Sequence, residues 1–289
     1  MEKISSKLII PSKVKNNLSW IMTGSNYEND LQNIMLPSAE NIFLKKKIGK
    51  SSSFFHPTTR PILAYKNNLI ISDYKGTIYN VNQKGKKNWK KNIYKKTYKY
   101  VHKNLVFSIY KGNIYVADNL GFFYSLNLNT GKVNWVKNNI IPFKSNMKVF
   151  DEKIYLIDQD NKIVCFKTKD GTLVWDLLSI SSFIKSQNLL SLASSVDNDL
   201  YAITSAADVF KIQGDSGQVY WSRNTASSLY ADATDFFYSS NILLHKEKIF
   251  FSSGNSTFSL DSKTGSTLWT KEVSTIGTPI VSGNNIFLN

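Results

Sequence analysis

The chain has 289 residues, of which 42% are hydrophobic and 13% aromatic, and its formal net charge is +15. It contains no run of eighteen apolar residues and is too apolar for a disordered polymer, so the sequence excludes a transmembrane helix and an intrinsically disordered chain. The charge is uneven: residues 1–150 hold 25 Lys and Arg against 6 Asp and Glu, whereas residues 151–289 hold 11 against 15.

Residues 1–58 read as an N-terminal extension ahead of the regular part of the chain. The opening MEKISSKLIIPSKVKNN has neither the apolar core of a secretion signal nor a Cys for lipid attachment. Further on, Leu18-Ser19-Trp20 resembles the Trp-bearing outer strand of a repeat that has no preceding strands. We expect residues around 17–23 to complete the last repeat and so close a ring.

From residue 59 onward the sequence repeats, because five times a Trp stands four residues after a Gly. The pairs are Gly85 and Trp89, Gly131 and Trp135, Gly171 and Trp175, Gly217 and Trp221, and Gly265 and Trp269. Successive Trp residues are 46, 40, 46 and 48 positions apart. A period of this size is typical of radial or solenoid repeats, in which one unit cannot bury its apolar surface alone.

Each repeat alternates apolar and polar residues with a period of two, in four short runs separated by turn residues. This pattern predicts a four-stranded antiparallel blade. The Gly of each pair lies where a hairpin needs a positive φ. The Trp then falls on the outermost strand, where its large flat ring can cover the gap between two blades. The predicted fold is therefore an all-β propeller formed by residues 59–289.

The blades are predicted at 59–95, 103–138, 145–178, 189–223 and 239–273, and a sixth begins at 278–289. A blade that stops in its second strand would leave backbone groups unpaired. We therefore expect the chain to be a fragment, with about five and a half blades of an expected eight.

The repeat resembles that of pyrroloquinoline-quinone-type propellers, most clearly from Tyr115 to Trp135. Within that superfamily the chain most resembles the BamB-type lipoproteins of the outer-membrane β-barrel assembly machinery. The resemblance covers nearly all of residues 18–289 and includes an opening motif read here at Trp20, Gly24, Asn26 and Asn29. The repeat is specific for the propeller class and less specific for the subfamily, because quinone enzymes share it.

An enzyme of the quinone-dependent class would need further features. The dehydrogenases that this repeat resembles use a vicinal Cys-Cys disulfide, a calcium ion held by Glu, Asn and Asp, an Asp base and a central funnel lined with aromatic planes. This chain has one cysteine, Cys165, which reads as a small buried apolar residue. Asp73 and Asp118 each stand three residues before a Gly and fit turn chemistry.

The three histidines, His56, His102 and His245, are isolated, and no short-range zinc spacing, phosphate loop or nucleophile elbow occurs. We therefore predict no catalytic residue, cofactor or metal. The alternatives are a quinone-dependent dehydrogenase, or a propeller that binds carbohydrate or a cell surface and exposes aromatic residues at its funnel mouth.

Lys84 to Lys103 is the most basic stretch, with nine lysines, no carboxylate and four aromatic residues among them. Such a mixture can bind nucleic acid. The lysines are expected on an outer strand and the loop after it, where they would face solvent with no ligand at all. Attraction to anionic headgroups or to an acidic partner is favoured over nucleic acid.

Two long connections between blades are the predicted partner-binding loops, since loops on a rigid sheet framework carry contacts. The BamB resemblance implies that they bind the barrel-insertion partner, with Phe183, Ile184 and Lys185 in the first and Asp232 and Asp235 in the second. Lys replaces an Arg of the family pattern, which weakens a bidentate carboxylate contact, and the Asp spacing is three rather than two. Phe183 could instead fill space beneath its loop, and a peptide could add to an exposed strand edge.

The sequence therefore predicts a non-enzymatic scaffold subunit of the outer-membrane protein assembly machinery. Its expected partners are the barrel-insertion protein and unfolded outer-membrane clients, with an anionic membrane surface as a further option and no nucleic acid. The location that the resemblance implies is the periplasmic face of the outer membrane.

Overall fold

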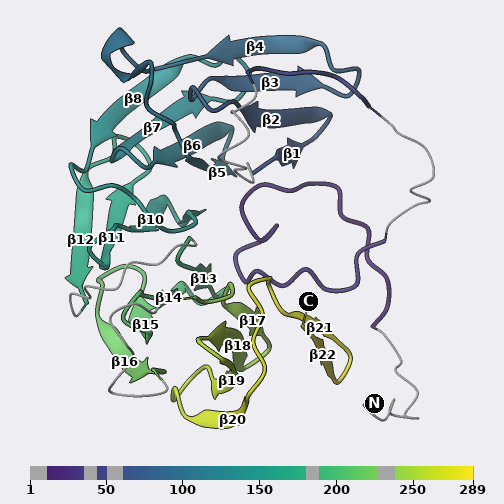
Figure 1. The fold of residues 1–289 in the computed structure, drawn as a ribbon, viewed down its shortest axis with the longest axis vertical. Helices are drawn as coiled ribbons and strands as arrows, with labels where there is room; N and C mark the ends of the chain where they lie inside the picture. Colours follow the sequence, from purple (N-terminus) through teal and green to yellow (C-terminus); the bar gives the residue numbers. More distant parts are fainter. Residues whose placement is uncertain (1–11, 36–43, 51–60, 180–188, 227–237, 289) are drawn as a thin grey trace.

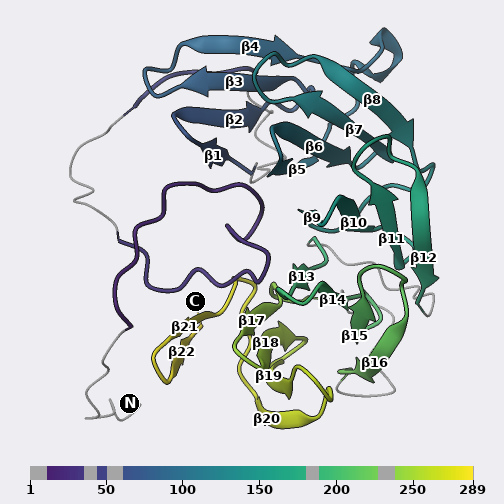
Figure 2. The ribbon, with the colours of Figure 1, turned by 180° about the vertical axis from the view of Figure 1, so that it is seen from behind.

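The computed structural model describes residues 12–35, 44–50, 61–179, 189–226 and 238–288. Within these ranges the strands form five four-stranded antiparallel sheets and one two-stranded sheet, set around a common axis (Figures 1 and 2). The predicted all-β propeller with four-stranded antiparallel blades is confirmed. No helix in this part of the chain is long and apolar enough to cross a membrane.

The blades follow one another in chain order, and each has its first strand nearest the axis and its fourth at the rim. Blade 1 contains β1 (Leu63–Tyr65), β2 (Asn68–Ser72), β3 (Ile78–Asn82) and β4 (Lys87–Lys91), and the 3₁₀ turn η1 (Lys96–Tyr98) follows it. Blade 2 contains β5 (Leu105–Tyr110), β6 (Asn113–Asp118), β7 (Phe122–Asn127) and β8 (Val133–Asn138). Blade 3 contains β9 (Lys148–Phe150), β10 (Lys153–Ile157), β11 (Lys162–Lys167) and β12 (Leu173–Leu178).

Blade 4 contains β13 (Leu192–Ser194), β14 (Asp199–Ile203), β15 (Asp208–Gln213) and β16 (Val219–Asn224). Blade 5 contains β17 (Leu243–His245), β18 (Lys248–Ser253), β19 (Ser256–Asp261) and β20 (Thr267–Lys271), and the two-stranded sheet contains β21 (Ile280–Ser282) and β22 (Asn285–Phe287). Each sheet lies within the range predicted for it, except that β16 runs one residue further.

Burial explains why the inner strands are so apolar. In β10, Ile154 to Ile157 are all buried, whereas β12 is mostly exposed and buries Trp175. An inner strand has a neighbouring blade on each face, so its side chains on both faces meet apolar surface. The core is thus built between blades, and one cluster that includes Tyr155, Leu200 and Phe251 joins blades 3, 4 and 5.

A β-bulge recurs at the same place in all five four-stranded blades. The register between the third and fourth strands shifts by one residue directly before the repeat Trp, as between Ser125 and Leu126 opposite Trp135. The same shift occurs opposite Trp89, Trp175, Trp221 and Trp269. A bulge re-aims a side chain by inserting an extra residue, so the repeat supplies each Trp with the same orientation.

An N-terminal segment lies inside the arc of blades, which is open between blade 1 and the two-stranded sheet (Figure 1, purple). The peptide groups of Trp20 and Ala64 of β1 exchange hydrogen bonds of 2.7 and 2.9 Å, and Ile109 of β5 donates to Ile21 at 2.7 Å. Ser194 of β13 donates to Tyr27 at 3.0 Å, and Leu244 of β17 donates to Glu28 at 2.9 Å. The segment therefore bonds to the innermost strands of blades 1, 2, 4 and 5.

Lys148, at the start of β9, adds blade 3 to these contacts. Its fully buried ammonium donates to the main-chain oxygens of Thr23 and Asn26 at 3.1 and 2.7 Å and to Asn29 Oδ1 at 2.6 Å. The amide nitrogen of Asn29 in turn donates to Leu192 and Ile242, at 3.0 and 2.7 Å. Asn29 thus links three blades at the axis.

The ring-closing role expected of residues 17–23 stays a prediction. The described bonds of Trp20 and Ile21 lead to β1 and β5 at the axis, and not to an outer strand of the last blade. The physical reason is that the inner strands offer unpaired backbone groups along the axis, and this segment pairs with them. The domain division at 58/59 stays a prediction, although residues 20–29 bond to the innermost strands of the blades.

Candidate functional site

The repeat Trp residues form the joints between neighbouring blades. Trp89, Trp135, Trp175 and Trp221 donate their indole N–H to main-chain oxygens of Leu128, Thr168, Gly214 and Ser262 in the next blade, at 2.8 to 3.2 Å. Each ring also lies on the repeat Gly of that next blade, so that a Cβ on Gly131 would stand 2.6 Å from ring carbons of Trp89. The five repeat glycines have φ between +68° and +76°. The Gly therefore both turns the chain and leaves room for the preceding blade's Trp.

The five predicted partner-binding residues, Phe183, Ile184, Lys185, Asp232 and Asp235, lie outside the described residues. Their flanks are described. The first connection leaves after Ser179 and returns at Leu189, and the second leaves after Ala226 and returns at Tyr238. Both join the outer strand of one blade to the inner strand of the next, so they stay the predicted partner-binding loops.

Connections between blades all emerge at one end of the ring, because each blade is a four-stranded meander with the same strand direction. This end exposes large apolar side chains in several successive connections. Tyr100 is 90% exposed between blades 1 and 2, and Ile140 is 84% exposed between blades 2 and 3. Leu178, the last residue of β12, is 66% exposed, and Ile276, between β20 and β21, is 63% exposed. We call it the connection end.

Ile140 is the least expected of these residues. Its φ is +68°, a left-handed conformation that is costly for a β-branched side chain. Asn138 stabilises it by accepting the Ile140 N–H at 2.6 Å, and Asn139 donates to the oxygen of Ile141 at 3.1 Å. Strained residues that present an exposed apolar group often belong to binding sites. Sequence reasoning missed Ile140, although an apolar pair between Asn and Pro in a polar turn was a signal.

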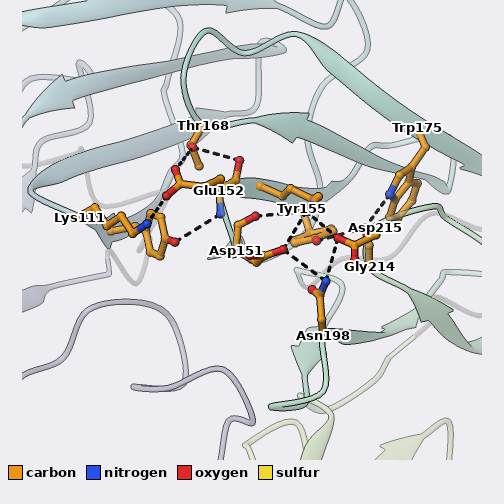
Figure 3. Close-up of polar contacts among 11 residues, drawn as sticks. Lys111, Asp151, Glu152, Tyr155, Thr168, Trp175, Asn198, Gly214 and Asp215 are labelled. Atoms are coloured by element: carbon orange, nitrogen blue, oxygen red, sulfur yellow. Dashed lines mark hydrogen bonds and ion pairs between the residues drawn. The ribbon is translucent and has the colours of Figure 1, made fainter.

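At the opposite end of the ring, several charged side chains pair with one another (Figure 3). Lys111 forms an ion pair with Glu152, whose other oxygen accepts from the Thr168 hydroxyl at 2.9 Å. Next to this group, Lys153 lies 2.9 Å from Asp151 and 2.7 Å from Asp215. These contacts join the turns of blades 2, 3 and 4.

The pKa shifts of the carboxylates at this end agree with their ion pairs. The hydrogen bond from Lys153 holds the pKa of Asp215 below its ordinary value, and the one from Lys111 does the same for the pKa of Glu152. Asn198 also donates to Asp215, at 2.9 Å. The carboxylates therefore already have partners within the chain, and this end ties the blades together.

Asp73 and Asp118 fill the structural role that their spacing predicted. One oxygen of Asp118 accepts the backbone N–H groups of Leu120 and Phe122, at 2.8 and 2.9 Å, and Asp73 accepts those of Lys75 and Thr77 in the same way. A carboxylate that holds two N–H groups of its own turn fixes the hairpin between the second and third strands. Burial raises the pKa of Asp118, which also accepts a hydrogen bond from the Tyr94 hydroxyl.

The residues that could have served redox or metal chemistry lie apart. Cys165 is buried in β11, and burial raises the pKa of its thiol to about 12. His245 Nδ1 lies 2.8 Å from Asp30, in a contact that attaches the axial segment to β17. In the part of the chain that the structure describes, no group of three His, Cys, Asp or Glu residues is placed to hold a metal ion.

A family model described as outer membrane protein assembly factor BamB, of the PQQ-type repeat, matches residues 74–289. The chain belongs to this family. The match to the BamB family thus covers three quarters of the chain, from the second half of blade 1 through the two-stranded sheet. Among curated proteins, no sequence matches.

The BamB-family chain is similar in structure to two kinds of propeller. BamB from Moraxella catarrhalis is 14% identical, with a TM-score of 0.63 over 80% of this chain and 69% of that one. Quinohemoprotein alcohol dehydrogenase from Comamonas testosteroni is 14% identical, with a TM-score of 0.65 over 88% of this chain and 49% of that one. A europium-containing methanol dehydrogenase is 14% identical, with a TM-score of 0.64 and coverages of 88% and 58%. At these identities the likeness shows the fold, and the chain spans about half the length of the two dehydrogenases.

Proposed function

We propose that this protein is a non-enzymatic scaffold subunit of the machinery that assembles outer-membrane β-barrel proteins. It binds the barrel-insertion partner through its connection end, receives unfolded outer-membrane clients and works at the periplasmic face of the outer membrane. The observation that carries the proposal is the match of residues 74–289 to the BamB family.

The structure supports this proposal through the contrast between the two ends of the ring. The connection end exposes Ile140, Leu178 and Ile276, whereas the opposite end exposes Val196 and pairs Lys111 and Lys153 with carboxylates. Exposed apolar groups held on a rigid framework are typical anchors of protein interfaces. The predicted partner residues from Phe183 to Lys185 belong to a connection that leaves from this same end.

A quinone-dependent dehydrogenase is the alternative function, because two of the similar structures are dehydrogenases. Such an enzyme needs an accessible central funnel. Here the axis is occupied by the segment around Asn29, which is fully buried against blades 4 and 5. This observation favours the scaffold, and titration with pyrroloquinoline quinone and calcium, followed by absorbance, tests the alternative.

The direct test measures binding of the purified chain to the periplasmic domains of the barrel-insertion protein by calorimetry. Two variants probe the connection end: Ile140→Ser with Leu178→Ser, and Lys185→Glu with Asp232→Lys. We expect each pair to weaken binding by about tenfold or more, because truncating an interface anchor costs roughly 1–2 kcal/mol.

The matched control is Val196→Ser, which removes an apolar side chain that is 91% exposed in the β13–β14 turn, at the opposite end. Its binding should equal that of the unchanged chain. Absence of binding by folded protein, or an equal loss in the Val196 control, would remove the proposed docking face.

A further inference from the structure

The connection between β4 and β5 lies in a stretch with an unusual charge. Residues 74–117 contain eleven lysines and no Asp or Glu. A general compositional preference for Lys does not explain this, because residues 151–289 hold more acidic than basic residues. The positive charge is therefore concentrated on blade 1 and its exit.

Of these lysines, Lys103 is buried and Lys111 is paired with Glu152, whereas most of the others are exposed. Lys95, Lys96 and Lys99 are exposed, and no lysine from Lys84 to Lys99 forms an ion pair with any residue that the structure describes. Tyr100 is 90% and Val101 40% exposed directly after them. We call Lys95, Lys96, Lys99, Tyr100 and Val101 the basic tip; the ribbon coil of η1 beyond the end of β4 marks it in Figure 1.

The base of the basic tip is held firmly on blade 2. The Tyr98 ring packs edge-on against Phe122 at 5.6 Å between centroids, and Tyr94 packs against Phe122 at 6.2 Å. Tyr94 also donates its hydroxyl to the buried Asp118. Lys103 donates its ammonium to the oxygen of Tyr98 and lies 5.1 Å from the Tyr94 ring. The aromatic residues of the base are thus used in packing, and the tip projects beyond them.

An exposed aromatic and an exposed aliphatic side chain, directly after three exposed lysines in the chain, suit the interface of an anionic lipid layer. Tyr can insert its ring at headgroup depth with its hydroxyl in water, and Lys side chains attract anionic headgroups. Lys99 already lies 5.2 Å from the Tyr100 ring, so charge and ring are presented together.

We propose that the basic tip docks this protein on an anionic membrane surface, with Lys95, Lys96 and Lys99 binding headgroup phosphates and Tyr100 and Val101 entering the interface. The basic tip lies at the connection end but uses other residues than the partner-binding anchors Ile140 and Leu178. Its test needs no barrel-insertion partner, so the proposal does not rest on the proposed function.

Nucleic acid is the competing ligand for a basic and aromatic surface, and the arrangement of the rings argues against it. Base stacking needs accessible ring faces. Tyr100 is the exposed aromatic residue of the basic tip, whereas Tyr94 and Tyr98 beneath it are packed against Phe122. A nucleic acid strand could therefore stack one base, on Tyr100. Docking on a lipid surface needs only an exposed apolar side chain with basic residues near it.

The test is co-sedimentation of the full chain with vesicles of phosphatidylcholine alone or mixed with phosphatidylglycerol. We expect binding to the mixed vesicles only, weakening as salt rises. The triple change Lys95→Glu, Lys96→Glu and Lys99→Glu should weaken it about 100-fold, because each lysine near such a surface contributes about a factor of five. Tyr100→Ser with Val101→Ser should weaken binding several-fold and leave its salt dependence unchanged.

The matched control reverses three other exposed lysines, as Lys132→Glu, Lys169→Glu and Lys271→Glu, and so alters the net charge equally. Circular dichroism verifies folding of each variant. Equal losses in both triple variants, salt-independent binding to neutral vesicles, or no binding to mixed vesicles would overturn the proposal. Tighter binding to a labelled single-stranded oligonucleotide than to vesicles would also overturn it.

Discussion

The indole N–H of Trp175 donates to the main-chain oxygen of Gly214 at 2.8 Å, and Tyr155 donates its hydroxyl to the same oxygen at 3.2 Å. One carbonyl of blade 4 is therefore held by two side chains of blade 3. The same Trp ring covers the repeat Gly of blade 4, Gly217. The joint thus combines packing with a hydrogen bond, and the two contributions can be separated by substitution.

Replacing Trp175 with Ala should lower the free energy of unfolding by about 3–5 kcal/mol, because a large buried ring is lost and a cavity is left. Replacing it with Phe should cost less, since most of the packing is kept and Tyr155 still bonds to the Gly214 oxygen. Urea unfolding followed by circular dichroism measures both. Equal losses for the two variants would show that the hydrogen bond, rather than the packing, stabilises the joint.

Gly131 and Gly112 provide a matched pair for testing the close contact between Trp and Gly. Both have positive φ, +68° and +76°. A Cβ on Gly131 would meet the Trp89 ring at 2.6 Å, whereas one on Gly112 would meet nothing within 4 Å. Gly112→Ala should therefore cost about 1 kcal/mol from backbone strain alone, and Gly131→Ala should cost a further ~1–3 kcal/mol. Urea unfolding gives both values, and equal losses would contradict the packing argument.

Stability should rise with pH above neutrality because of Lys148. Burial lowers the pKa of this lysine to about 7, against an ordinary value of 10.5. Between these values the unfolded chain keeps the proton and the folded chain releases it, so the unfolded state binds more protons and raising the pH favours folding. From about pH 7 to about pH 8.5 the gain should be about 2 kcal/mol.

Lys148→Met removes the titrating group, so its stability should change less over the same pH range. Urea unfolding of both proteins at several pH values provides the comparison. The range stops below the pH at which an unfolded thiol ionises, since Cys165 contributes with the opposite sign there. Parallel pH profiles for the two proteins would refute the assignment to Lys148.

Cys165 should resist thiol reagents while the protein is folded. The side chain is fully buried in β11, and burial raises the pKa of its thiol to about 12. A reagent therefore cannot reach the sulfur, and little of the reactive thiolate is present. Ellman's reagent should react slowly in buffer and completely in denaturant. Fast reaction in buffer, with the circular dichroism spectrum unchanged, would show that β11 opens locally.

Much of the propeller could be predicted from the sequence because its signals are local. Gly131 and Trp135 lie in one hairpin, so their spacing reports a turn and a strand directly. The contact between Trp89 and Gly131 was not predicted, because it joins two repeats and depends on the bulge that aims the ring. Repetition alone shows that units stack, but not which side chains meet.

The axial segment and the connection end were harder to predict for a different reason. Residues 20–30 show no strand alternation, and their place is set by partners such as Lys148 and Ile242 far along the chain. Ile140 stands in a short polar connection, where sequence gives no sign of a left-handed backbone. Long-range pairing and local strain are properties of the assembled ring.

Asn29 has a consequence for the order in which the molecule can form. In a repeat protein, each unit normally depends only on its neighbours. Asn29, however, bonds to Ile242, 213 residues later, and to Leu192 of the blade before. During synthesis the segment around Asn29 leaves the ribosome before blades 1 to 5, yet its bonding is complete only after Ile242 has been made. A segment that is translated ahead of these blades therefore reaches its final place after most of them, and it makes distant blades unfold together.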